Sequence, residues 1–137
     1  MRYDRTVHLD TDFATAVERV RDALAAQGFG VLTEIDVTAT LKAKLDHAAE
    51  NMEAYVILGA CNPALAHRAL ETDRSIGLLL PCNVVVRRDG DRTAVQALDP
   101  NTMVALTELD ALRPVAEEAT RRLDAALAAL APGGTAG

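Results

Sequence analysis

The chain has 137 residues, half of them apolar, and 14 basic against 20 acidic side chains give a net charge of −6. This length and apolar content suit one domain with a real core and exclude a disordered chain. An acidic surface repels a phosphate backbone, and no apolar run approaches the about 20 residues that cross a bilayer. We therefore expect a single domain over residues 1–131, a flexible tail over residues 132–137, no nucleic-acid partner and no membrane.

The first eleven residues are polar and charged, unlike a secretory signal peptide, which indicates a cytoplasmic protein. In that compartment the two cysteines are expected to be free thiols and not a structural disulfide.

Residues 3–9 are predicted to form a strand. An N-cap at Asp10-Thr11 then opens a helix that begins at residue 13 and ends before Gly28, a typical C-terminal signal. Residues 31–37 alternate apolar and polar side chains and predict a second strand. The helix is predicted from apolar side chains at helical spacing, namely Phe13, Val17, Val20 and Leu24.

Residues 38–46 are ambiguous, although Leu41 and Leu45 lie four apart and favour a short helical turn. Residues 47–53 are predicted to be a polar loop, and residues 55–59 an apolar strand.

Asn62-Pro63 gives the strongest boundary signal in the chain. Asn is a favoured N-cap, and Pro is favoured at the first helical position because its missing N–H is not needed there. We therefore expect a helix over residues 63–72, followed by an apolar run over residues 76–80 that Pro81 interrupts.

Residues 83–88 and 93–98 predict a hairpin with Asp89-Gly90 as its turn. A loop at Asp99-Pro100-Asn101 leads to a last helix that begins at Leu109 or Pro114 and runs to about residue 131. The buried stripe of this helix is expected to be Leu112, Val115, Ala119, Leu123, Ala126 and Leu130.

This order of elements contains one hairpin and does not alternate strands and helices regularly. It predicts an α+β fold with a mainly antiparallel sheet and helices on one face.

Two near-mirror motifs, Cys61-Asn62-Pro63 and Pro81-Cys82-Asn83, contain the only cysteines. If the strands over residues 55–59 and 83–88 are antiparallel, the end of the first lies beside the start of the second. We therefore expect Cys61, Asn62, Cys82 and Asn83 to converge at one edge of the sheet as a candidate ligand-binding or thiol site.

Two interpretations of this site stay open. A thiol just before a helix N-terminus is favoured as the thiolate, which predicts a nucleophilic, persulfide-carrying or redox Cys61, with Cys82 inert in its apolar run. In the other interpretation both cysteines are small core residues, Asn62 is only a cap and Asn83 only a turn residue.

A metal site needs more ligands than these. The sequence has no Cys-x-x-Cys or Cys/His spacing of the structural zinc type, and His67 comes six residues after Cys61 on the predicted helix. Two thiolates alone would suit only a soft ion such as Cu(I). We expect no metal and no cofactor.

The segments over residues 57–63 and 77–84 resemble a small bacterial and archaeal family known as domain of unknown function 302. The resemblance extends to residues 35–42, the Asp99-Pro100 loop and the long C-terminal helix. It implies a compact α+β domain with a curved antiparallel sheet, broadly like one half of the TATA-binding-protein fold, and often a dimer. It implies neither DNA binding nor catalytic roles, because the family has no settled activity.

We therefore expect a small cytoplasmic homodimer whose two-cysteine edge binds a small ligand or handles sulfur or redox equivalents. The alternative is a structural or regulatory homodimeric module with no chemistry. The expected dimer surface is the alanine-rich end of the last helix, which contains Ala125, Ala126, Ala128 and Ala129.

Overall fold

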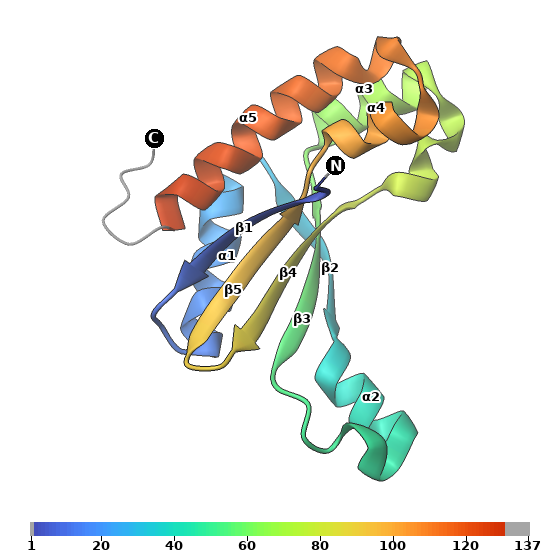
Figure 1. The fold of residues 1–137 in the computed structure, drawn as a ribbon. Helices are drawn as coiled ribbons and strands as arrows, with labels where there is room; N and C mark the ends of the chain where they lie inside the picture. Colours follow the sequence, from blue (N-terminus) through green and yellow to red (C-terminus); the bar gives the residue numbers. More distant parts are fainter. Residues whose placement is uncertain (1, 131–137) are drawn as a thin grey trace.

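A computed structural model describes residues 2–130 of the chain (Figure 1). The expected tail over residues 132–137 lies outside the described residues. All strands join one antiparallel sheet in the order β1-β5-β4-β3-β2. The helices and strands are β1 (Asp4–Leu9), α1 (Phe13–Ala26), β2 (Gly30–Asp36), α2 (Val37–Leu45), β3 (Tyr55–Cys61), α3 (Pro63–Thr72), β4 (Cys82–Asp89), β5 (Arg92–Leu98), α4 (Asn101–Thr107) and α5 (Arg113–Leu130).

Helices cover one face of the curved sheet and leave the other face open (Figure 1). The strands alternate accordingly: in β3, Val56, Leu58 and Ala60 are buried under the helices, whereas Tyr55 and Ile57 point to the open face and are half-buried. The predicted α+β fold with a curved, mainly antiparallel sheet is thus confirmed.

The core has two parts that α5 joins. Leu123, Leu127 and Leu130 of α5 pack with α1 against the sheet. Earlier in the same helix, Val115 and Ala119 pack in a second cluster with side chains of α3 and α4. All six residues of the stripe predicted for the last helix are buried, five of them in α5 and Leu112 just before it.

The helix α1 ends as predicted but begins at a different cap. Asp12, not Asp10-Thr11, is the N-cap, and its Oδ2 accepts a hydrogen bond from the Thr15 N–H at 3.2 Å. Asp12 directly precedes the first helical residue and therefore reaches the free N–H groups of the first turn. Gly28 follows the last turn with φ +83°, a conformation that glycine adopts without strain.

The middle of the chain is more regular than predicted. The strand β3 continues two residues past Gly59 and ends at Cys61, because this stretch still pairs with both neighbours: Gly30 with Cys61, and Ala60 with Cys82. Of the ambiguous residues, 38–45 are helical as part of α2, which already begins at Val37, the predicted last residue of the preceding strand. A short 3-10 helix (Asp46–Ala49) follows and occupies the start of the predicted polar loop.

The hairpin β4–β5 has Gly90-Asp91 as its two-residue turn, not Asp89-Gly90, because Asp89 still pairs with Arg92. Gly90 takes φ +64°, as the tight turn requires. The apolar run over residues 76–80 lies mostly in a 3-10 helix (Arg74–Leu79).

The predicted loop at Asp99–Asn101 is shorter than expected, because α4 already begins at Asn101. A 3-10 turn (Asp110–Leu112) then precedes α5, so the last helix begins beside Pro114 and not at Leu109. Within residues 2–130 no helix is both long and apolar enough to cross a membrane.

We predict that Gly59→Ala destabilises the fold. A Cβ at this position would overlap Thr33 Oγ1 and lie 2.9 Å from Pro81 Cγ, so these two side chains must shift. We expect the free energy of unfolding to fall by about 1–3 kcal/mol in urea denaturation. Gly30→Ala is the matched strand control, because a Cβ there meets nothing within 4 Å. Equal stability of the two variants would contradict the predicted clash.

Candidate functional site

The two cysteines lie at the same end of two central, neighbouring strands. Cys61 is the last residue of β3 and Cys82 the first residue of β4. Their strands are antiparallel, and Ala60 pairs with Cys82, so Cys61 lies one residue out of register beside Cys82. The register therefore brings the two cysteines to the same end of neighbouring strands.

Both cysteines line one small apolar cavity of ≈ 30 Å³ on the helix-covered side of the sheet. Its walls come from both parts of the core: Phe29 and Ala60 from the first, Leu65 and Met103 from the second. The cavity therefore lies where the two clusters meet. It can hold a water-sized group, for which about 10–15 Å³ suffice. It is far smaller than the about 300 Å³ at which ordinary small-molecule pockets begin.

The environment of the pair differs from that of free thiols in water. Burial in the apolar cavity raises the pKa of the Cys82 thiol, and the nearby Cys61, which is negative as a thiolate, raises it further. Cys82 is therefore a protonated thiol at neutral pH. Cys61 is half-buried and precedes the cap of α3.

Asn62 lines the same cavity but already has a structural role. It is the N-cap of α3, and its Oδ1 accepts a hydrogen bond from the Leu65 N–H at 3.2 Å. Pro63 takes the first helical position, as predicted. The cap fixes where β3 ends and thereby fixes the place of Cys61.

Asn83 does not lie with the other three predicted residues. It pairs with Gly59 and is exposed, and it lines a wider basin on the open side of the sheet. The cause is the two-residue period of a strand: Cys82 and Val84 face the helices, so the residue between them faces the opposite way. The candidate site therefore divides into a thiol cavity on one face and Asn83 on the other.

The histidines lie away from the cavity. Each pairs with a carboxylate near the surface: His8 with Asp89 at 3.3 Å, His47 with Glu50 at 3.1 Å and His67 with Glu71 at 3.1 Å. Within residues 2–130 no group of three His, Cys, Asp or Glu side chains could hold a metal ion.

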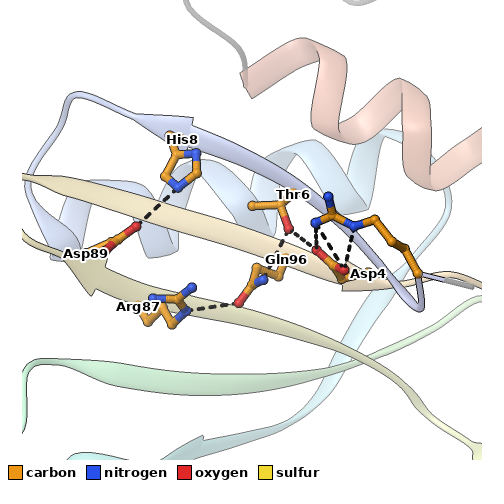
Figure 2. A network of polar contacts seen from close by, with 7 residues as sticks. Asp4, Thr6, His8, Arg87, Asp89 and Gln96 are labelled. Carbon is orange, nitrogen blue, oxygen red and sulfur yellow. Dashed lines mark hydrogen bonds and ion pairs between the residues drawn. The ribbon is translucent and has the colours of Figure 1, made fainter.

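Sequence reasoning missed a polar network on the open face (Figure 2). Arg87 Nε donates to Gln96 Oε1 at 2.9 Å, and Gln96 Nε2 donates to Thr6 Oγ1 at 3.1 Å. Thr6 in turn donates to Asp4 Oδ2 at 2.6 Å. The sequence carried a signal for this network in the strand alternation, because Thr6, Arg87 and Gln96 each follow a residue that faces the helices.

Comparison with known proteins places the chain among proteins without an assigned activity. Residues 5–130 match the family described as "Domain of unknown function DUF302". The chain is similar to the crystal structure of an uncharacterized conserved DUF302 protein from Bacillus stearothermophilus, with 31% identity and a TM-score of 0.85. That similarity covers 93% of this chain and 97% of the other. No curated protein matches the sequence significantly.

We predict that Asn62→Ala and Asn83→Ala differ in stability. Asn62→Ala removes the cap of α3 and should lower the free energy of unfolding by about 1 kcal/mol. Asn83→Ala serves as the control, because this side chain is exposed and should change the stability little. Urea denaturation measures the free energy of unfolding of both variants. An equal loss of this free energy in the two variants would contradict a stabilising role of the Asn62 cap.

Proposed function

Because the chain belongs to the DUF302 family, which is described only as a domain of unknown function, we propose a function from its own thiols: Cys61 and Cys82 form a reversible dithiol–disulfide couple. Such a couple suits the cytoplasm, where small thiols keep an accessible pair reduced between turnovers.

The observation that carries the proposal is that both thiols share one cavity of ≈ 30 Å³. This volume favours sulfur and redox chemistry over the binding of an organic molecule inside the cavity, because ordinary ligand pockets begin at about 300 Å³. Cys61 follows Ala60, the register partner of Cys82, so the two cysteines are neighbours across the paired strands. Strand alternation directs the residue after Ala60 away from the helices, so the disulfide requires the Cys61 side chain, at the last position of β3, to turn toward Cys82.

The co-reactant in this proposal is a small-molecule disulfide. The Cys61 thiolate attacks one of its sulfurs, the small disulfide bond breaks, and one small thiolate leaves. Cys82 then loses its proton to solvent and attacks the Cys61 sulfur, which releases the second small thiol and closes the Cys61–Cys82 bond. Two protein thiols are oxidised and one small disulfide is reduced to two thiols.

The order of attack follows from the pKa of Cys82. Burial and the nearby Cys61 both raise this pKa, so Cys82 is the weaker first nucleophile. Once Cys61 is in a mixed disulfide it has no thiolate charge. The part of the increase in the Cys82 pKa that comes from this charge then disappears, and the part that comes from burial remains. The second step therefore becomes easier only after the first has occurred.

We predict that Cys61 alkylates faster than Cys82. At pH 7 the Cys82→Ser protein, which keeps Cys61, should react with iodoacetamide faster than the Cys61→Ser protein, which keeps Cys82. The rate of Cys82 should rise only above the usual thiol range, because its pKa is raised. Rates measured against pH by mass spectrometry test this.

If both variants stay inert while folded, the thiols are core residues, and the interaction module without chemistry becomes the better description. Urea-unfolded samples of the same two variants are the control, since both thiols must then react alike.

We also propose that the protein is a homodimer through an arm formed by β2 and α2. Three large apolar side chains of this arm are exposed, Leu32 by 67%, Ile35 by 49% and Leu45 by 52%, and no residue of α2 described by the structure is buried. The alanines of α5 are less available, since Ala126 is buried and Ala125, Ala128 and Ala129 are half-buried. A two-fold contact between arms would cover the exposed side chains.

The dimer predicts a light-scattering mass of twice the 14.6 kDa of one chain at micromolar concentration. Leu45→Glu should shift the mass toward one chain, because a charge would enter the contact. Leu78→Glu is the control, since Leu78 is an exposed leucine outside the arm. A wild-type mass of one chain would exclude the dimer, and an equal effect of both substitutions would exclude this interface.

A further inference from the structure

A second hollow lies on the open face of the sheet, on the side opposite the thiol cavity. It has a volume of ≈ 440 Å³ and is lined by side chains of β1, β3, β4 and β5, among them Asn83, Val85 and Gln96. This volume falls within the about 300–1,000 Å³ of ordinary small-molecule sites. Its functional groups play no part in the proposed thiol chemistry.

The hollow brings together both tyrosines of the chain, which has only two and no tryptophan. Tyr3 precedes β1 and is 68% exposed, and Tyr55 begins β3 and is half-buried. The rest of the apolar lining includes Val85 and Leu98. An aromatic ring that keeps an accessible face is a stacking surface for a flat ligand.

The two carboxamides of the hollow differ: that of Gln96 has a defined orientation, and that of Asn83 is free to choose its own. Arg87 only donates, so the Gln96 oxygen must face it, and the Gln96 nitrogen then faces Thr6, as Figure 2 shows. Each end of this carboxamide keeps one unused hydrogen-bonding position. The side chain of Asn83 makes no hydrogen bond to another residue of the range 2–130, so its whole carboxamide is available.

The two charged side chains that line the hollow, Arg2 and Asp4, form an ion pair with each other. Asp4 is paired with Arg2 at 3.1 Å and also accepts a hydrogen bond from Thr6. These two charges therefore neutralise each other. Arg87 beside the hollow forms no ion pair within residues 2–130, but its Nε is already directed at Gln96, and the whole chain has a net charge of −6. The hollow suits an uncharged ligand and disfavours phosphate.

We propose that this hollow binds a free nucleobase or its uncharged nucleoside. Such a ligand offers a flat face to the tyrosine rings, and the donor and acceptor groups on its edge match the carboxamides of Asn83 and Gln96. A nucleic-acid strand is excluded by the same charge argument, because its phosphates would meet an acidic protein.

Ligand binding in the hollow can be measured by NMR through the two tyrosine rings. Protein with ¹³C-labelled tyrosine rings has two sets of ring signals, and both rings line the hollow. Titration with adenosine or with uridine should shift both sets and reach saturation, whereas ribose alone should shift neither. No saturable shift with either nucleoside, or an equal shift with ribose, would overturn the proposal. Tighter binding of adenosine monophosphate than of adenosine would overturn the choice of an uncharged ligand.

Variants separate specific binding from a general surface effect. Asn83→Ala should weaken binding by about threefold to tenfold, because it removes hydrogen bonds to the base edge. Tyr3→Leu should weaken it by about fivefold or more through lost stacking, with Tyr55 still reporting. Asn51→Ala is the matched control, an exposed asparagine outside the hollow that should leave the affinity unchanged. Equal affinities of the Asn83 and Asn51 variants would refute the assigned role of Asn83.

Discussion

The register between β3 and β4 is the constraint on which the rest of this structure depends. Ala60 pairs with Cys82 and Gly59 with Asn83, and this pairing decides which side chains meet. A shift of one residue would turn Cys82 away from the helices and bring Asn83 under them. The small volume at Gly59, which lies against Thr33 and Pro81, helps to hold this register. One backbone pairing thus sets both the thiol cavity and the hollow on the open face.

Helix α5 explains why a cavity exists at this place. Its second half packs on the sheet with α1, and its first half packs on α3 and α4. The two clusters meet above the ends of β3 and β4, where Val115 and Ala119 of α5 line the cavity. A junction between two packed clusters is harder to fill than the centre of either, so a small space next to the cysteines follows from the architecture.

Much of this fold could be predicted because its signals are local. Asn62-Pro63 marks the start of α3, Gly28 marks the end of α1, and the apolar stripe of α5 is buried as its spacing indicates. The exact hairpin turn and helix α4 were missed, because tertiary pairing decides such boundaries. The division of the candidate site has the same origin: sequence proximity placed Asn83 with Cys82, whereas the strand period sends neighbours to opposite faces.

The proposed dithiol–disulfide couple requires that the Cys61 and Cys82 sulfurs can form one bond. The most direct test is to equilibrate the native protein with oxidised glutathione, block free thiols in acid and map the tryptic peptides by mass. We expect one species in which the Cys61 peptide is joined to the Cys82 peptide, although cleavage at Arg68 and Arg74 separates them in the chain. Glutathione attached to Cys61 with Cys82 still free, or no modification of either cysteine, would contradict it.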